Sequence, residues 1–414
     1  MMMDLKREGS AYRAYRTCAY RNKYETALIF GGKSFTYGEL LSGAEQAYNT
    51  FRQMGIEPRE RVCLWLPNCP DLLRIFYGLS RMGAIGVFAH PDAAPAEVIK
   101  QMEATGAARL ITTAQNYEAF CSYAGPLGAG KISICRPERE MKGKVLRLYR
   151  QKNPASEDLF ELDFLDQQME KNRYHAGDAA YLDPSQPAAI LFGSSSFLQV
   201  KPVEYLPAEL YEKSQLFYGK NEAAKSVYIE HSFAFEGGFL AAHSALCSGK
   251  TILWGKEEAV ALLKHNQPDL IVATEELFWL LRQRAGEFRG RWKNLQGGIQ
   301  MGRAVSPLMR KYAPRALEKM GGKGCFSESA AELKIGKEPL CFMGDFGVRL
   351  ADVAAAVSNF DGIEKCRCLP YQGGFILQIM PQKKGDQQLG AALIQRCRRE
   401  MGPLHLPKKV EFIG

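Results

Sequence analysis

Hydrophobic residues in the first part of the chain recur with two periods that alternate along the sequence. Short continuous apolar runs predict buried strands, and apolar residues spaced three to four apart predict amphipathic helices. We expect strands at residues 26–30, 62–66, 84–89 and 109–112, and helices at 40–54, 70–82 and 95–105. Continuous apolar strands separated by amphipathic helices are typical of a parallel sheet that is covered on both faces.

The same alternation returns in the middle of the chain. Further strands are expected at residues 188–192, 226–229, 251–254, 270–272 and 297–299. We interpret this half as a second parallel sheet. The predicted fold class is therefore α/β, with two doubly wound, mostly parallel sheets in a large domain, residues 1–340.

Residues 341–414 follow a different pattern. They predict a helix at 350–357, strands at 364–369 and 374–380, a basic helix at 387–400 and a strand at 409–413. Helices and strands without a repeated β-α alternation predict a small α+β domain.

Two segments are rich in basic residues. Residues 4–23 combine six basic residues with Asp4 and Glu8 and lack the apolar region of a targeting peptide, so we expect a solvated first helix. Residues 131–157 carry eight basic side chains interrupted by a few acids, and we favour a surface excursion there over a specific anion site.

The composition narrows the function classes. The chain has 414 residues, of which 46% are hydrophobic and 24% charged, which excludes a disordered or collagen-like protein. The net charge of +9 suits anionic partners, but it is too diffuse to indicate nucleic acid. No apolar stretch approaches the about 20 residues of a membrane-spanning helix.

The cysteines indicate the compartment. There are eleven, with no CxxC pair, and the one close set is Cys366 and Cys368. We interpret that set as opposite faces of a strand rather than a metal site. An odd number of scattered cysteines favours a reduced, cytoplasmic environment.

Five collinear segments carry a resemblance to a known family. They are residues 35–40, 61–64, 66–68, 81–84 and 188–203. Together they resemble the adenylate-forming superfamily, which includes acyl-CoA synthetases and other AMP-dependent ligases. The resemblance implies a protein that adenylates a carboxylate with ATP and Mg2+ and transfers the acyl group to a thiol.

The family's phosphate-binding loop corresponds to Phe192–Pro202. The resemblance makes Gly193, Ser194, Ser195 and Ser196 its remnant, and Ser194, Ser196 and Lys201 keep its hydroxyl groups and its cation. Three glycines of the family pattern are replaced by Ser195, Leu198 and Pro202. Leucine and proline stiffen a loop that needs open backbone N–H groups to bind phosphate, although a structural turn and a working cradle both remain open at this point.

The second landmark of the family matches residues 324–331. Phe326 stands at its aromatic position and Ser329 at the hydroxyl position that contacts the adenylate phosphate. Ala330 stands where the family has its Mg2+-binding glutamate, and alanine has no ligand atom for a hard cation. Glu328 substitutes only if the register shifts.

The remaining nucleotide contacts are also altered. Met301, Gly302 and Arg303 resemble the turn beside the adenine, and Asp345 matches either the ribose-binding aspartate or the hinge. Residues 406–413 resemble the family's last strand before the loop of its catalytic lysine, and that loop is not in the sequence.

The resemblance places an acyl pocket near His231, Phe233 and Gly237. An aromatic residue there is more often part of the core than a ligand contact.

We therefore expect an AMP-dependent ligase-like protein with eroded ATP and Mg2+ machinery. It is expected to be adenylation-deficient and to bind an acyl group, an acyl thioester or a carrier protein. An acidic acyl carrier protein or the CoA phosphates are expected on a basic C-terminal face formed by Lys383, Lys384, Arg396, Arg398, Arg399, Lys408 and Lys409. The alternative is a divergent active ligase that uses Lys201 and Ser329 to adenylate an aryl or fatty carboxylate for transfer to CoA or a phosphopantetheine thiol. ATP and Mg2+ are expected only with this alternative, and neither hypothesis includes a nucleic acid or a membrane span.

Overall fold

The structure is a computed structural model of the chain. It describes residues 10–124, 131–153, 164–172, 183–192, 202–255, 259–288, 292, 294–300, 307–322, 325–328, 340–343, 346–371, 374–382, 387–401 and 406–413.

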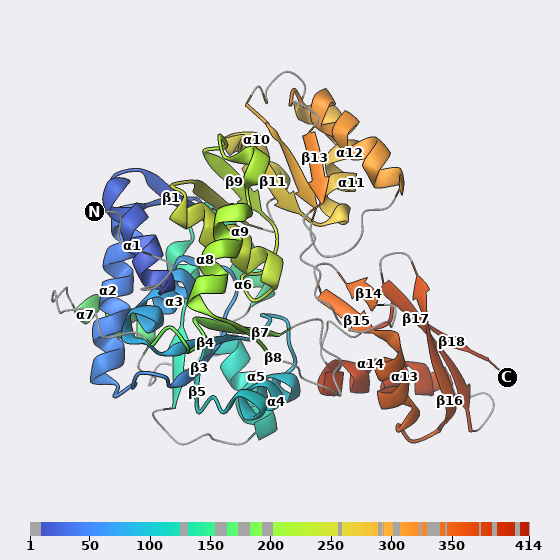
Figure 1. Ribbon diagram of the computed structural model, residues 1–414. Helices are drawn as coiled ribbons and strands as arrows, with labels where there is room; N and C mark the ends of the chain where they lie inside the picture. Colours follow the sequence, from blue (N-terminus) through green and yellow to red (C-terminus); the bar gives the residue numbers. More distant parts are fainter. Residues whose placement is uncertain are drawn as a thin grey trace.

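One of the two large sheets has six strands in the order β6-β5-β3-β4-β7-β8 (Figure 1). Its neighbours pair in parallel except for β8, which is antiparallel to β7. The strands are β3 (Arg61–Trp65), β4 (Ile85–Phe88), β5 (Arg109–Thr113), β6 (Ile132–Cys135), β7 (Ala189–Phe192) and β8 (Pro202–Tyr205).

The other large sheet has seven strands in the order β13-β12-β11-β9-β10-β1-β2. They pair in parallel except for β2, which is antiparallel to β1. The strands are β1 (Thr26–Phe30), β2 (Lys33–Thr36), β9 (Ser226–Ile229), β10 (Thr251–Trp254), β11 (Leu270–Ala273), β12 (Gly297–Gln300) and β13 (Cys325–Glu328).

The predicted fold class is confirmed, but the strands are not divided between the sheets in chain order. The first strand of the chain, β1, pairs with β10 and so belongs to the later sheet. Conversely, β7 pairs with β4 and completes the earlier sheet. The hydrophobic pattern marks a strand as buried on both faces, and it contains no information about which buried strand lies beside it.

Helices form three layers around the two sheets. The inner layer packs against both sheets in one hydrophobic core and comprises α1 (Ala11–Arg21), α2 (Tyr37–Gln53), α3 (Pro70–Met82) and α9 (Glu236–Cys247), with α8 (Pro207–Leu216) beside α9. The outer face of the six-stranded sheet is covered by α4 (Pro95–Thr105) and α5 (Ala114–Ala124). The outer face of the seven-stranded sheet is covered by α10 (Ala259–Asn266), α11 (Glu275–Gln283) and α12 (Pro307–Lys319).

Local sequence signals set several helix ends. Thr36 and Glu39 form a capping box at the start of α2: the Thr36 hydroxyl accepts from the Glu39 N–H at 3.1 Å, and the Glu39 carboxylate accepts from the Thr36 N–H at 2.7 Å. At the end of α3, Gly83 adopts a φ of +78°. This left-handed conformation favours glycine and stops the helix.

The first helix is not simply solvated, as the sequence suggested. Helix α1 buries Ala11, Tyr12, Tyr15, Cys18 and Ala19. The Tyr15 ring stacks on Tyr77 of α3 with 4.2 Å between ring centroids. The basic residues of α1 occupy only its outer face. The expectation of a solvated helix is therefore wrong for the inner face of α1, which is buried.

The surface excursion expected at residues 131–157 is also only partly present. Residues 132–135 form β6, which pairs with β5 as an edge strand. Two basic residues of the segment form ion pairs: Arg136 and Arg139 contact Asp166 at 2.8 and 2.5 Å. Asp166 lies in the short helix α7 (Leu165–Lys171), and helix α6 (Gly143–Lys152) precedes it in the chain.

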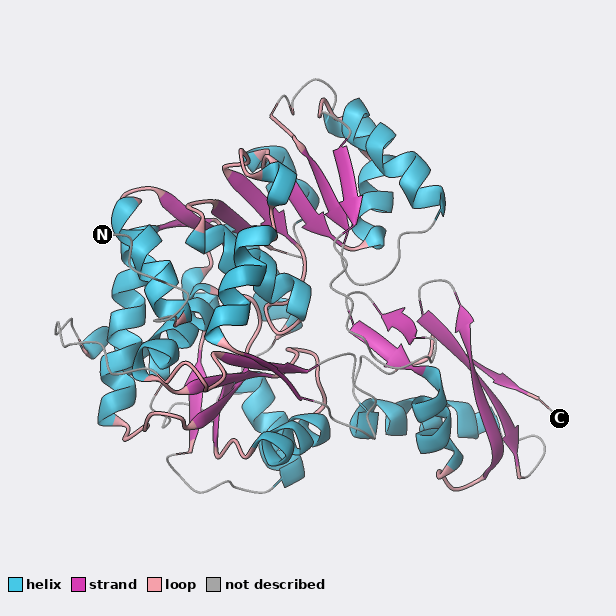
Figure 2. Cartoon of the chain, in the orientation of Figure 1, coloured by secondary structure: helices cyan, strands magenta, loops and turns pink. Residues whose placement is uncertain are grey.

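The C-terminal part builds a separate small core (Figure 2). Its elements are the hairpin β14 (Leu340–Met343) and β15 (Phe346–Arg349), then α13 (Leu350–Ser358), β16 (Ile363–Tyr371), β17 (Gly374–Pro381), α14 (Gln387–Met401) and β18 (Lys409–Phe412). Cys366 and Cys368 both lie in β16, but they share the face that packs on this core. Residues two apart in a strand point the same way, so the prediction of opposite faces is wrong.

In the part of the chain that the structure describes, no helix combines the length and the hydrophobicity needed to cross a bilayer.

Candidate functional site

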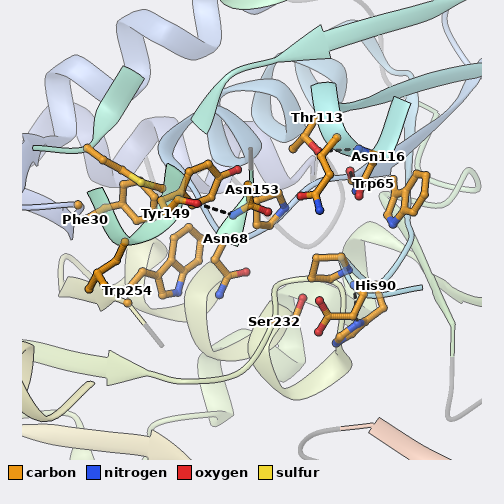
Figure 3. Close-up of a pocket in the computed structure, with 18 of the residues that line it drawn as sticks. Phe30, Trp65, Asn68, His90, Thr113, Asn116, Tyr149, Asn153, Ser232 and Trp254 are labelled. Atoms are coloured by element: carbon orange, nitrogen blue, oxygen red, sulfur yellow. Dashed lines mark hydrogen bonds between the residues drawn. The ribbon is translucent and has the colours of Figure 1, made fainter. Parts of the chain in front are cut away.

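A chamber of about 570 Å³ lies where the two large sheets meet (Figure 3). Strands of both sheets end at it, and each contributes a residue at or just after its carboxyl end. His90 follows β4, and the others are the last residues of their strands: Trp65 of β3, Thr113 of β5, Phe30 of β1, Ile229 of β9 and Trp254 of β10. Carboxyl ends of parallel strands are the usual position of ligand sites in α/β folds.

The basic segment supplies another wall of the chamber. Met141 precedes α6, and Val145, Leu148 and Tyr149 line the chamber from one face of that helix. On the opposite face, Arg147 and Arg150 are exposed. Apolar residues at a spacing of three and four produce this division.

Asn68 connects the two sheets beside the chamber. It follows β3, and its side-chain Nδ2 donates to the carbonyl oxygen of His231 at 2.8 Å. Its Oδ1 accepts from the backbone N–H of Phe233 at 2.7 Å. Because both carboxamide atoms are used, Asn68 fixes the turn that carries Ser232 into the chamber wall.

The acidic and basic groups of the chamber are partly engaged in the protein itself. The Glu230 carboxylate accepts from the N–H and the hydroxyl of Thr274, at 2.8 and 2.7 Å, and thereby helps to position the start of α11. His90 Nδ1 accepts from the backbone N–H of Asp92 at 3.2 Å. These carboxylate and imidazole groups therefore hold the local backbone of the chamber wall in place.

Arg398 comes to the same chamber from the small C-terminal core. It lies in α14, which contacts α4 of the large part of the chain. Its guanidinium is exposed, and among the described residues no ion-pair partner is found for it. It therefore offers a positive charge to an anionic group of a ligand.

A buried polar cluster lies behind the chamber in the inner helix layer. His243 of α9 is buried, and its Nδ1 lies 3.0 Å from the hydroxyl of Tyr77. The Nε2 of His243 lies 3.6 Å from Cys247 Sγ. Burial lowers the pKa of His243 to about 4, because a charged imidazolium loses its hydration there.

Most residues that the sequence singled out for phosphate and nucleotide lie outside the described residues. They are Gly193, Ser194, Ser195, Ser196, Lys201, Met301, Gly302, Arg303, Ser329 and Asp345. Phe192 and Pro202, the first and last residues of the predicted phosphate-binding loop, are described: Phe192 ends β7, and Pro202 begins β8 and pairs with it.

Two of the predicted nucleotide contacts fall in β13, at the edge of the seven-stranded sheet. Phe326 packs edge-to-face on Phe278, with 5.2 Å between ring centroids, in the outer core. Glu328 ends the strand. Phe326 does not line the chamber.

The residues predicted for the acyl pocket lie next to the chamber. His231 and Phe233 are 1% and 0% exposed, and Phe233 packs among Phe76, Phe88 and other aromatic rings. Gly237 is buried in the first turn of α9. Their neighbours Glu230 and Ser232 reach the chamber, whereas these three residues do not line it.

Sequence reasoning missed the aromatic and carboxamide lining. Trp65, Asn116, Tyr149 and Trp254 line the chamber, and no motif pointed to them. One signal was present in the sequence, because Trp254 ends the predicted apolar strand 251–254 and Trp65 is the last residue but one of the predicted strand 62–66. Within the described ranges, no group of three or more His, Cys, Asp or Glu side chains is placed to hold a metal ion.

A family model described as "AMP-binding enzyme" matches residues 15–329. Among curated proteins, 4-coumarate–CoA ligase 3 of Oryza sativa subsp. japonica is 34% identical over 103 residues, which are 25% of this chain and 19% of that protein. 4-Coumarate–CoA ligase 1 of Solanum tuberosum is 36% identical over 80 residues, 19% of this chain and 15% of that protein. The matched segments thus span less than a fifth of these relatives.

Solved structures of similar fold cover almost the whole chain. An amide bond synthetase from Marinactinospora thermotolerans has a TM-score of 0.74 at 12% identity, with 98% of this chain and 95% of that chain covered. A long-chain-fatty-acid-CoA ligase from Archaeoglobus fulgidus has a TM-score of 0.71 at 12% identity, with 98% and 97% covered. At such identities the likeness concerns the fold.

Proposed function

Because the chain belongs to the AMP-binding enzyme family, we propose that it is an acyl-CoA synthetase-like protein that binds an acyl group or acyl thioester and is deficient in adenylation. The chamber between the sheets is the proposed binding site. A cytoplasmic location is part of the proposal, supported by the nine cysteines whose side chains the structure describes, all of which are free thiols.

The chamber is the observation that carries the binding function. Its volume of about 570 Å³ is in the range of small-molecule sites. Aromatic and aliphatic side chains form most of its wall, and the carboxamides of Asn116 and Asn153 add polar groups. Further polar residues, such as Asp92, Thr113 and Gln115, also line it. A chamber with this mixture of apolar and polar side chains suits an acyl or aryl body with a carbonyl group.

The deficiency in adenylation rests on the sequence at the family's ATP positions. Ala330 replaces the Mg2+-binding glutamate, and Leu198 and Pro202 replace loop glycines. Proline has no N–H to donate to phosphate. Each lost group of this kind removes about 3 kcal/mol of transition-state stabilisation, so together they leave little adenylation.

The matching partner is an acyl carrier or thioester with negative charge, held by the basic C-terminal face. Of the lysines of this face, Lys409 begins β18 and Lys408 precedes it. Lys409 contacts Glu411 at 2.9 Å, and Arg396 contacts Asp361 at 3.8 Å. These exposed ion pairs are weak, so carboxylates of an acidic partner readily replace Glu411 and Asp361 as the partners of the two basic side chains.

The second candidate is a divergent active ligase that uses ATP and Mg2+. The retained Ser194, Lys201 and Ser329 favour it. In that case these residues bind the phosphate groups, and the acid occupies the same chamber.

Carboxylate-dependent ATP–pyrophosphate exchange separates the two candidates. The acid panel includes 4-coumarate and a long-chain fatty acid, which appear in the names of the relatives. The proposal predicts no exchange above the acid-free blank, together with saturable binding of one acid or its CoA thioester in calorimetry. Exchange at ordinary enzyme rates would establish the active ligase instead.

A further inference from the structure

Cys366 and Cys368 share one face of β16 in the small C-terminal core. Both side chains are half-buried, whereas Arg367 between them is exposed. A metal site was excluded at this pair because strand alternation was expected to separate the two thiols. Residues two apart in a strand point the same way, so that reason does not hold.

The two thiols contact each other. The Cys368 thiol donates a hydrogen bond to Cys366, which holds the pKa of Cys366 below its usual value although burial acts in the opposite direction. Burial raises the pKa of Cys18, Cys63 and Cys247, so those thiols stay protonated. The thiolate is the form that binds a metal ion, and it is therefore favoured at Cys366.

The sheet holds the two cysteines at a nearly constant separation. Cys366 lies opposite Ile379 of β17 and Cys368 opposite Leu377, and both of these partners are buried. Residues two apart in a strand have Cα atoms about 6.6 Å apart. A disulfide usually joins Cα atoms about 5.5 to 6 Å apart, so a direct S–S bond would bend β16 against its pairing with β17.

An ion between the two sulfur atoms needs no such bend. A metal–thiolate bond is about 2.3 Å long in zinc sites, so two bonds of this kind join sulfur atoms up to about 4.6 Å apart. Two thiols that hydrogen-bond to each other are close enough for this bridge. The pair is thus better arranged to bind an ion than to form a disulfide.

The number of ligands indicates which ion fits. Zn2+ in a structural site takes four ligands. In the described part of the chain, no three His, Cys, Asp or Glu side chains are grouped to supply such a set. Two thiolates suit a soft ion that is stable with two ligands, and soft sulfur ligands favour Cu(I).

We propose that Cys366 and Cys368 form a two-thiolate binding site for Cu(I). Two Cu–S bonds form, the thiol protons pass to solvent, and no electron is transferred. Both side chains are partly exposed on the edge strand of their sheet (Figure 1), which gives the ion access from solvent. Neither cysteine lines the chamber, so the inference is independent of the proposed function.

Titration of the whole reduced chain tests the site. Cu(I) is supplied without oxygen as its coloured bicinchoninate complex, and the loss of colour measures transfer to the protein. We expect one tightly bound equivalent. Cys366→Ser and Cys368→Ser should each weaken its binding by about 100-fold or more, because even a residue that only orients a ligand contributes about 10- to 100-fold. Cys121→Ser is the matched control, since Cys121 is also half-buried but lies in α5, outside the pair.

Alkylation of the parent chain locates the ion without any variant. The chain is loaded with one equivalent of Cu(I), treated briefly with N-ethylmaleimide and digested, and the modified peptides are quantified. A thiolate bound to the ion is no longer a free nucleophile. Alkylation of Cys366 and Cys368 should therefore be lost, and alkylation of Cys121 should stay as it is in the metal-free chain.

Two results would overturn the inference: serine variants that bind Cu(I) as tightly as the parent, or alkylation of Cys366 and Cys368 that the ion leaves unchanged. Displacement of the bound Cu(I) by an equal concentration of Zn2+ would overturn the choice of ion. Circular dichroism shows whether the serine variants fold, and if one does not, the alkylation of the parent chain decides.

Discussion

Asn68 and Phe233 are 165 residues apart in the chain, yet the side chain of one accepts the backbone N–H of the other at 2.7 Å. The same carboxamide donates to the carbonyl oxygen of His231. Asn68, which follows β3, therefore holds the turn after β9. These hydrogen bonds fix the positions of the two sheets relative to each other at the chamber.

Replacing Asn68 by aspartate tests this connection. Aspartate keeps the acceptor for Phe233 and loses the donor for His231, so a buried carbonyl oxygen faces a carboxylate. We expect a loss of about 2 kcal/mol in the free energy of unfolding, measured with urea. Asn266→Asp is the control, because Asn266 makes one hydrogen bond, to Leu262, at a helix end. Equal losses in both variants would contradict a special role for Asn68.

Gly238 makes the same turn possible from the other side. A Cβ at this position would overlap the carbonyl oxygen of Ser232 in the chamber wall. We expect Gly238→Ala to cost about 3 kcal/mol and to weaken ligand binding, because the turn must move. Gly286→Ala is the control, since open space surrounds its Cβ position. Thermal unfolding of both variants decides, and an unchanged Tm for Gly238→Ala would refute the packing argument.

The buried His243 makes stability depend on pH. Its pKa is about 4 in the folded protein and about 6.5 when unfolded, so between these values the unfolded chain binds more protons. Stability should therefore fall as the pH falls below about 6.5, by about 2 kcal/mol between pH 7 and pH 5. His243→Gln should remove this part of the slope, whereas replacement of the exposed His265 should not. Parallel slopes in the parent and His243→Gln would show that other groups cause the loss.

Arg398 should attract the anionic end of a bound acid. Arg398→Gln is expected to weaken binding of the acid by about 1 kcal/mol at low salt. The difference in binding free energy should shrink at high salt, because the side chain is exposed and salt screens its charge. Arg396→Gln serves as the control, since Arg396 stacks on Phe360 and contacts Asp361. A loss that salt leaves unchanged would mean that Arg398 acts through packing.

The elements were largely predictable from the sequence, because burial on both faces leaves a continuous apolar run such as that of β3. The placement of β1 in the later sheet was not predictable. β1 and β10 are far apart in the sequence and pair only in the folded protein, so no local pattern indicates that they are neighbours. For the same reason the sequence did not bring Trp65 and Trp254 into one chamber. The basic stretch was misread because charge dominates its composition, although Val145, Leu148 and Tyr149 already had helical spacing.

The motif residues raise a different difficulty. A resemblance carries a role to Lys201 or Ser329 only if the surrounding backbone is kept, and both lie outside the described residues. His231 and Phe233 were expected at the ligand and are buried beside it, because the chain turns between them and only Ser232 faces the chamber.

The most direct test of the whole account is the rate at which the purified chain incorporates labelled pyrophosphate into ATP at a saturating concentration of an acid that it binds. The account predicts binding of the acid and a rate equal to the acid-free blank. Incorporation at about 1 s⁻¹ or faster, within the usual range for enzymes, would contradict it.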